Sequence, residues 1–446
     1  MGWRIATTTL GFLFSAAVPL TAAEAAGVLH LHDRTVDASL SGVDSQGRLL
    51  FEVGGDVGGG DRSATAEAIP LEQVVAWRGE VELRQRAREA IVLTDGSLIY
   101  GTLLTIRGER IMLQHAVFGP QEFGLDDAAG IVFDVDAVDV AGLLSAWSAD
   151  SLQAEDTVYT AAGDSVAGVA DIDQRGLSLL SRRAEASVKV RRGAEPLAFS
   201  VSKLAAIRFS PALRPIASLG DGGWWLGFDE GTQLRVAQLA VAGGRRVTCE
   251  LACGVAIAMP EPAVADQLVA IEHPSQSPRW QLLGPAELLD AKAIAPFAFR
   301  PQPRFAASWS VPWGGGTLPA NRCRMRGASR LVWEAGGSWT HLTGTARLEP
   351  PPDPSPLASD VRGAAGAAAA ATAAVRLRVF AITDAGAVEL WSGQPLDTPG
   401  QTLNFTVPLA ASGGRIPGRI VLLIDSDRRD SPQPSLCFEY LRLSRL

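Results

Sequence analysis

A pattern that recurs about every 67 residues constrains the fold of this chain more than any other feature. Its clearest copy, IVLTDGSLIYGTLLTIRGERIMLQHAVFGPQEFGLDDAAGIVFD, spans residues 91–134, and a second copy spans 157–210. Gly96 and Gly163 hold the same place in these copies, 67 residues apart, and Gly231 follows 68 residues later. A period this steady indicates duplicated structural units.

Each copy reads as five short strands with turns between them, which is too little chain for two full sheets. A small, strongly bent, partly closed barrel is the economical way to bury one face of such a sheet. The endings LDDAAGIVF and VSKLAAIRF resemble the last strands of SH3-like or Sm-like barrels. In this interpretation Gly96 allows the positive φ of a hairpin turn, and Gly101 permits the bend of a curled strand.

The rest of the chain divides around these copies. Two weaker copies flank the clear ones, and six or more alternating strands near the C-terminus indicate a two-sheet sandwich. We therefore expect an all-β protein of tandem small five-stranded barrel-like repeats followed by a β-sandwich. The predicted segments are a signal peptide (1–25), repeats 1 to 4 (28–80, 88–136, 157–212 and 222–283), a helical linker (137–156) between repeats 2 and 3, and the sandwich (284–446) with an Ala/Pro-rich insertion (350–374).

The N-terminus has the form of a secretory signal. Arg4 precedes an apolar run that ends at Leu20, and the small residues Ala23-Glu24-Ala25 follow in the form that a signal peptidase cuts. An uncleaved anchor is the alternative, but the run is short and Thr7 to Thr9 interrupt it. We expect an exported protein, periplasmic, cell-surface or extracellular, that does not span a membrane after cleavage.

The net charge of the chain and the catalytic motifs that it lacks argue against several classes of function. The formal net charge is −8, which argues against nucleic acid as a partner because phosphate binding needs a basic face. The sequence contains no Gly-x-Ser-x-Gly elbow, His-Glu-x-x-His pair, phosphate loop or dinucleotide fingerprint. We expect no enzyme; a glycosidase would need two facing carboxylates across a cleft.

Four cysteines in an exported chain allow up to two disulfides. Cys249 and Cys253 are too far apart along a strand to bridge unless the chain turns between them. Cys323 and Cys437 both lie in the C-terminal region and could pair there.

Three stretches of the C-terminal region resemble one known family. They are MRGASRLVWEAGGSWTHLTGTARLEP (325–350), VRLRVFAITDAGAVELWSG (375–393) and GRIVLLIDSDRRD (418–430). Together they resemble the NPCBM/NEW2 family, a carbohydrate-binding module named for glycosyl hydrolase family 98, with Trp391 in the family's hairpin. The resemblance implies an exported jelly-roll β-sandwich that binds glycans. Small barrel repeats before such a module are familiar from exported proteins of planctomycete-type bacteria.

The tryptophans of this region carry the sugar-binding hypothesis. Trp333 shares a strand face with Leu331, which is typical of a core row, whereas Trp339 has the polar neighbours Thr340 and His341. Stacking on a sugar needs an exposed ring. Trp339, His341 and Trp391 are therefore the carbohydrate-binding candidates.

One acidic loop could hold a metal ion. Asp425, Asp427 and Asp430 offer the clustered oxygens that calcium prefers. Arg428 and Arg429 interrupt them, and this favours a salt-bridged turn. We expect no cofactor, and keep calcium at these three residues as the alternative.

Two functions remain open from the sequence. The first is a non-catalytic protein that recognises carbohydrate or cell-surface glycan through the sandwich. The second is an interaction scaffold of the cell envelope, in which the repeats bind protein partners and the sandwich is structural. Exposed aromatic rings over a shallow groove would favour the first, and apolar patches on the repeats the second.

Overall fold

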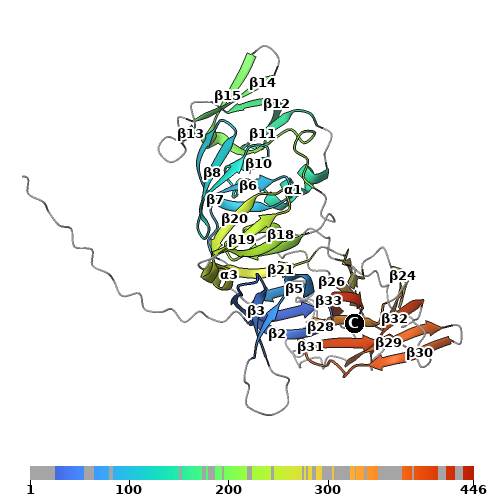
Figure 1. The fold of residues 1–446 in the computed structure, drawn as a ribbon. Coiled ribbons are helices and arrows are strands. Elements are labelled where there is room, and N and C mark those ends of the chain that lie inside the picture. The colour runs from blue at the N-terminus through green and yellow to red at the C-terminus, as the bar shows by residue number, and fades with distance from the viewer. Residues whose placement is uncertain are drawn as a thin grey trace, which may run out of the picture.

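The computed structural model is almost entirely β-structure, with two short α-helices in the part that it describes (Figure 1). The description covers residues 26–445 except for the gaps 55–64, 80–83, 150–152, 173–176, 179–185, 193–194, 218–222, 243–245, 274–275, 278–279, 284–287, 294–303, 306–321, 327, 336–338, 350–373, 384–385, 410–417 and 427–434. The predicted signal peptide (1–25) and the predicted insertion lie outside the described residues, apart from Ala374. No helix of the described part is long and apolar enough to cross a membrane.

Each of the four repeats is built from five principal strands. Repeat 1 contains β1 (Ala26–Leu31), β2 (Thr35–Val43), β3 (Leu49–Val53), β4 (Thr65–Ile69), the 3-10 turn η1 (Leu71–Gln73) and β5 (Val74–Gly79). Repeat 2 contains β6 (Glu89–Leu93), β7 (Leu98–Arg107), β8 (Arg110–His115), β9 (Gly119–Gly124) and β10 (Ala128–Val132). Repeat 3 contains β11 (Asp156–Thr160), β12 (Ser165–Ile172), the short β13 (Leu177–Ser178), β14 (Ser187–Arg192), β15 (Glu195–Ser200), η2 (Val201–Lys203) and β16 (Leu204–Arg208). Repeat 4 contains β17 (Trp224–Phe228), β18 (Gln233–Ala242), β19 (Arg246–Leu251), β20 (Ala256–Pro260), α3 (Glu261–Gln267) and β21 (Leu268–Glu272).

The four repeats share one connectivity. In each repeat the first strand pairs with both the second and the fifth, and the second to fourth principal strands pair in sequence. A short helical turn precedes the fifth strand in three repeats, at η1, η2 and α3. No pairing between the fourth and fifth strands occurs in the described part, so barrel closure stays a prediction.

The glycines that recur in the repeats serve two separate structural roles. Gly96, Gly163 and Gly231 sit in the first turn of their repeats with φ of 90°, 91° and 105°, a region that L-residues with side chains rarely adopt. At Gly101 and Gly168 a Cβ atom would lie 2.7 Å from a carbonyl oxygen of the next strand. The first set permits the turn, and the second permits close approach of two strands.

The repeats stack in the spatial order 3, 2, 4, 1, which differs from their order in the chain (Figure 1). The fifth strands of repeats 2 and 3 pair through β10 and β16, and those of repeats 1 and 4 pair through β5 and β21. Repeats 2 and 4 meet at their first turns, where Leu98 bridges Gln233. Repeat 4 therefore returns to fill the space between repeats 1 and 2.

A helix covers the joint between repeats 2 and 3. The helix α1 (Val140–Ala149) lies inside the predicted linker 137–156. Its Trp147 is 2% exposed, and the ring lies where a Cβ on Gly130 of β10 would be, at 2.4 Å. The helix thus packs on the paired strands, and Arg208 of β16 donates a hydrogen bond to the Trp147 carbonyl at 2.6 Å.

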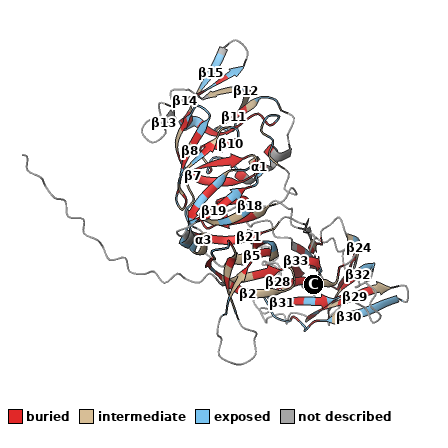
Figure 2. Ribbon diagram, viewed as in Figure 1, coloured by how far each residue is buried: buried red, intermediate tan, exposed pale blue. Residues whose placement is uncertain are grey.

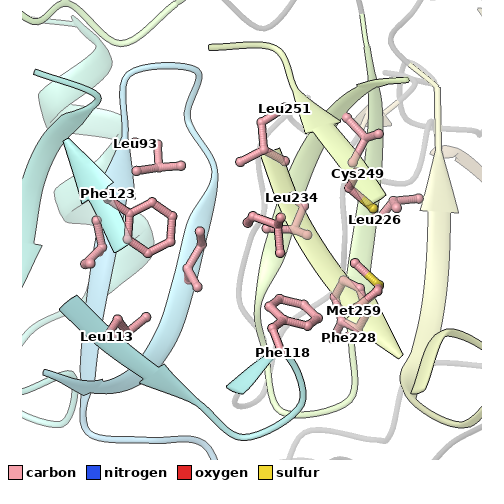
Figure 3. Packing of buried hydrophobic residues seen from close by; sticks show 14 of the residues in the cluster. Leu93, Leu113, Phe118, Phe123, Leu226, Phe228, Leu234, Cys249, Leu251 and Met259 are labelled. Carbon is pink, nitrogen blue, oxygen red and sulfur yellow. The ribbon is translucent and has the colours of Figure 1, made fainter. Parts of the chain in front are cut away.

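One apolar core cluster runs through all four repeats, and buried residues fill the centre of the stack (Figure 2). Figure 3 shows Phe118 of repeat 2 reaching toward the side chains of repeat 4. The rings of Phe118 and Phe228 lie 5.1 Å apart at 81°, an edge-to-face contact that aromatic pairs favour. The stack is therefore held by side-chain packing as well as by strand pairing.

A buried polar network also joins repeats 2 and 4. The backbone N–H of Arg235 donates to Ser97 Oγ at 2.8 Å, and that of Tyr100 donates to Thr232 Oγ1 at 3.1 Å. His115 is fully buried; its Nδ1 accepts two backbone N–H bonds at 3.0 and 3.1 Å, so its Nε2 carries the proton. Nε2 lies 2.9 Å from Glu230 Oε1. Nε2 also lies 2.9 Å from Thr232 Oγ1, so hydrogen-bond partners compensate the burial of both His115 ring nitrogens and of the two backbone N–H groups.

Two neighbouring acids in this network differ in protonation. Burial and a hydrogen bond that the protonated Asp229 carboxyl donates to Glu230 raise the pKa of Asp229 to about 6, against the ion pair with Arg84 at 2.8 Å. Burial alone would raise the pKa of Glu230 as well, but the hydrogen bond and charge of His115 outweigh it and lower that pKa. The two carboxyl groups therefore lose their protons at different pH values, Glu230 first and Asp229 near pH 6.

The C-terminal region is a sandwich of two antiparallel sheets. The seven-stranded sheet contains β22 (Gln276–Ser277), β23 (Trp280–Leu282), β25 (Arg304–Phe305), β26 (Arg322–Arg326), β28 (His341–Glu349), β31 (Thr402–Pro408) and β33 (Ser435–Ser444). The five-stranded sheet has the order β24 (Leu288–Ala293), β27 (Ser329–Glu334), β32 (Arg419–Ser426), β29 (Val375–Thr383) and β30 (Gly386–Ser392). A second apolar cluster, which includes the fully buried Trp333, fills the space between them.

A bulge in β33 docks the sandwich on repeat 1. The pairing with β28 shifts there, and Tyr440 takes a φ of 48°, a conformation unusual for a bulky residue. The bulge brings the Tyr440 ring to 4.4 Å from that of His30 in β1. Arg442 then donates hydrogen bonds to the carbonyls of Leu31 and Arg34. The sandwich is therefore a fixed continuation of the stack.

Candidate functional site

The structure buries the tryptophan that the sequence suggested as a sugar platform. Trp339 is 8% exposed and belongs to the sandwich core, and the Arg445 guanidinium lies 4.7 Å from its ring centre. An exposed ring is needed for stacking on a sugar, so Trp339 does not form such a platform. His341 is half-buried, its Nδ1 lies 2.9 Å from Thr340 Oγ1, and burial lowers its pKa.

Trp391 lies at another place, on the edge strand β30. Its register partner Val379 is buried in the core, so the tryptophan points inward between the two sheets. There it stacks on Phe405 of β31, with ring centroids 5.5 Å apart. Trp391 thus packs between the two sheets at the edge of the sandwich. The three carbohydrate-binding candidates therefore do not form one site.

The acidic loop is described only at its start. Asp425 is exposed on β32, opposite Arg376 of β29, while Asp427 and Asp430 lie outside the described residues. Within the described residues no group of three or more His, Cys, Asp or Glu side chains is placed to hold a metal ion.

The suggested pairing of Cys323 with Cys437 is wrong. Both side chains are buried, and neither forms a disulfide in the structure. Cys323 lies opposite Phe438 in the β26–β33 register, and Cys437 lies opposite Arg324. Adjacent residues of a strand point to opposite faces, so the two thiols lie on different sides of the sheet. Cys249 and Cys253 are free as well.

The structure reveals a different candidate, the outer face of the five-stranded sheet. Side chains alternate between the core and this face along each strand, and the register aligns the outward ones in rows. The central row runs from Val332 of β27 through Val421 of β32 to Phe380 of β29. We call these three residues the apolar strip. Val332 and Val421 are each 6% exposed, so only Phe380 of this strip, which is half-buried, has side-chain surface open to a ligand.

Planar ion pairs bound the apolar strip on both sides. Arg330 Nη2 lies 2.8 Å from Asp290 Oδ2 on the β24 side. On the β30 side both guanidinium nitrogens Nε and Nη2 of Arg378 donate to the Glu389 carboxylate, which lowers the pKa of Glu389. The Arg378 guanidinium also lies 5.0 Å from the centre of the Phe380 ring.

This arrangement suits an amphipathic ligand. A saccharide ring has apolar C–H faces that pack on aromatic and aliphatic side chains, and hydroxyls that pair with planar carboxylates and guanidinium groups. Sequence reasoning missed the face because a strand pattern does not tell which alternate set points outward. The signal was the segment 376–382, RLRVFAI, in which arginine and phenylalanine share one phase of the alternation.

Comparisons with known proteins found similarity only to solved structures. No protein-family model matches the chain, and none of the curated proteins matches it. The chain is similar to the module CBM51 from Clostridium perfringens GH95 in complex with methyl-galactose, at 12% identity, over 37% of this chain and 99% of that one, with a TM-score of 0.23.

Two further solved structures show similar values. The CBM51-2 and INT domains from Clostridium perfringens ZmpB match at 10% identity, over 48% of this chain and 40% of that one, with a TM-score of 0.24. A family 29 carbohydrate-binding module, CBM29-2, matches at 11% identity, over 32% and 93%, with a TM-score of 0.18. At such low TM-scores we base the function on this chain's own residues.

Proposed function

We propose that this chain is an exported, non-catalytic protein that binds carbohydrate or cell-surface glycan on the outer face of the five-stranded sheet. The observation that carries the proposal is the half-buried Phe380 on this face, with an Arg–carboxylate pair on each side of the strip to which it belongs. Export is inferred from the signal-like residues 1–25, and the lack of catalysis from the missing catalytic motifs.

The charges on this face define the class of saccharide. Arg330 and Arg378 are each held by a carboxylate, and Arg376 lies opposite Asp425. Arg330 and Arg378, which flank the strip, are therefore already neutralised, and this favours a neutral saccharide over an acidic one. Binding needs no calcium in this proposal, because hydroxyls meet side chains directly.

The test uses the full chain on an array of neutral and anionic glycans, followed by calorimetric titration of any hit. Phe380→Ala and Arg378→Ala should each weaken binding about 10-fold or more, from lost stacking and lost charge-assisted hydrogen bonds. Arg324→Ala is the matched control, because Arg324 also pairs with a glutamate, Glu349, but on the other sheet. It should bind as the unchanged protein does.

Two results would contradict the proposal. If Arg324→Ala weakened binding as much as Arg378→Ala, the site would lie on the seven-stranded sheet. If the folded chain bound no glycan, the scaffold hypothesis would take its place. That alternative is favoured by exposed apolar side chains on repeat 3, Val169 at 53% and Leu197 at 46%.

A further inference from the structure

The joint between repeat 1 and the sandwich encloses an arginine that forms no hydrogen-bonded ion pair within the described residues. The Arg442 side chain is fully buried, and its terminal nitrogens donate only to the carbonyls of Leu31, Arg34 and Tyr440. In the described part of the chain Arg442 forms no ion pair. Burial lowers the pKa of Arg442 to about 9, because a buried charge is unfavourable unless an opposite charge accompanies it.

Three more fully buried donors near this arginine have no hydrogen-bond partner among the residues that the structure describes. They are Thr343 Oγ1, Ser444 Oγ and Trp280 Nε1, and Arg442 Nε is unpaired as well. The register puts them side by side: Thr343 lies opposite Arg442, and Trp280 lies opposite Ser444, two residues further along β33. Directly opposite residues on one sheet face have Cβ atoms about 4.5 to 5.5 Å apart, so Thr343 adjoins Arg442 and Trp280 adjoins Ser444, and the long side chains of Arg442 and Trp280 extend over the same face.

The electrostatic surroundings are positive. Burial lowers the pKa of His30, and the nearby charges of Arg442 and Arg78 lower it further. Asp33 attracts Arg442, but its buried Oδ1 accepts no hydrogen bond. The neighbourhood thus combines an excess of donors with an excess of positive charge.

We propose that a small monovalent anion of the size of chloride binds in this joint, held by Arg442 Nε, Thr343 Oγ1, Ser444 Oγ and Trp280 Nε1. An anion accepts hydrogen bonds from all four groups and places a negative charge in hydrogen-bond contact with the guanidinium, which Asp33 does not do. A water molecule would accept from some of these donors but would add no charge beside the guanidinium. The anion therefore stabilises the contact between repeat 1 and the sandwich.

The test measures thermal unfolding of the full chain in sodium chloride and in sodium gluconate at equal ionic strength. Chloride and bromide should raise Tm with concentration, whereas gluconate is too large for the joint. Thr343→Val and Ser444→Ala should each reduce this halide-dependent rise by half or more. Thr345→Val is the matched control, because its hydroxyl lies on the same strand face but already pairs with Asn404 at 2.8 Å. It should keep the full rise.

A crystal soaked in bromide gives the second readout. An anomalous peak beside Arg442, Thr343 and Ser444 is the expected result. Equal Tm values in chloride and gluconate, together with water and no bromide at this place, would overturn the proposal. Asp33→Asn removes the carboxylate that competes with the halide for the Arg442 charge. This variant should bind the halide more tightly, and a smaller halide-dependent rise in Tm would contradict the assignment.

Discussion

At the scale of single residues, Asp229 couples the stability of the repeat stack to pH. Its pKa is about 6 in the folded protein, against an ordinary value of 3.8. Between these two pH values the folded state holds the proton more tightly than the unfolded state does. The stabilisation from this carboxyl is thus complete below about 3.8 and is lost as the pH rises through about 6.

Asp229→Asn should therefore stabilise the protein at pH 7, by on the order of 2 kcal/mol, because the amide keeps the uncharged form at every pH. The advantage over the unchanged protein should shrink to near zero at pH 4. Urea midpoints at pH 4, 5, 6 and 7 measure it. Asp164→Asn, in the exposed first turn of repeat 3, is the control for removing a carboxylate that is not buried. A constant difference across the pH range would contradict this explanation.

The four cysteine thiols should all be reactive once the chain is unfolded. In the folded protein, burial raises the pKa of Cys323 to about 12 and keeps the thiolate fraction small. Denaturation without reductant should release four titratable thiols per chain, matching the four cysteines of the sequence. Two or fewer would mean that a disulfide forms after all.

At the scale of the strand, the close approach at Gly168 controls the curl of repeat 3. A Cβ there would lie 2.7 Å from both the Arg191 carbonyl oxygen and Val190 Cγ1. Gly168→Ala should destabilise the protein by about 1–3 kcal/mol, because the strands must separate to admit the methyl group. Gly418→Ala, with open space around it, should change stability little. Urea unfolding compares the two, and equal midpoints would refute the steric explanation.

Strands could be predicted from the sequence because their signals are local. The turn glycines and the alternating runs of residues 91–134 act within a few residues, and these strands form as expected. Trp339 shows the opposite case: its neighbours Thr340 and His341 are polar, but Arg445, 106 residues later in the chain, covers its ring. Which face of a strand is outward depends on such distant contacts.

At the scale of the whole molecule, aromatic side chains connect the stack to the sandwich. Trp280 is fully buried, lies 4.9 Å from the ring of His273, and packs with Val75 and Tyr440. The spatial order of the repeats could not be read from the sequence either, because pairing such as β5 with β21 depends on complementarity between distant strands. The linear order of the copies gave no hint of it.

Trp280→Ala should loosen repeat 1 from the sandwich and destabilise the protein by about 3–5 kcal/mol. Hydrogen exchange should rise in β5, whose Val75 and Ala76 lose their cover. Trp333→Ala is the matched control, because this tryptophan is equally buried but lies between the two sheets of the sandwich. It should raise exchange in the sandwich and leave β5 protected. Unchanged β5 exchange in Trp280→Ala would mean that the joint is held elsewhere.

The spatial order 3, 2, 4, 1 also dictates when the protein can finish folding. Trp77 in β5 pairs with Ile271 in β21, 194 residues later in the chain. Until repeat 4 has been synthesised, repeats 1 and 2 have no neighbour between them, and the β5 edge stays open to other strands. Contacts over such separations form slowly, and unpaired edges invite aggregation. A ribosome or translocation pore that releases this chain from its N-terminus therefore delivers repeat 4, which lies inside the stack, as the last of the four repeats. A chaperone that shields β5 would have its greatest effect between the synthesis of repeat 1 and that of repeat 4.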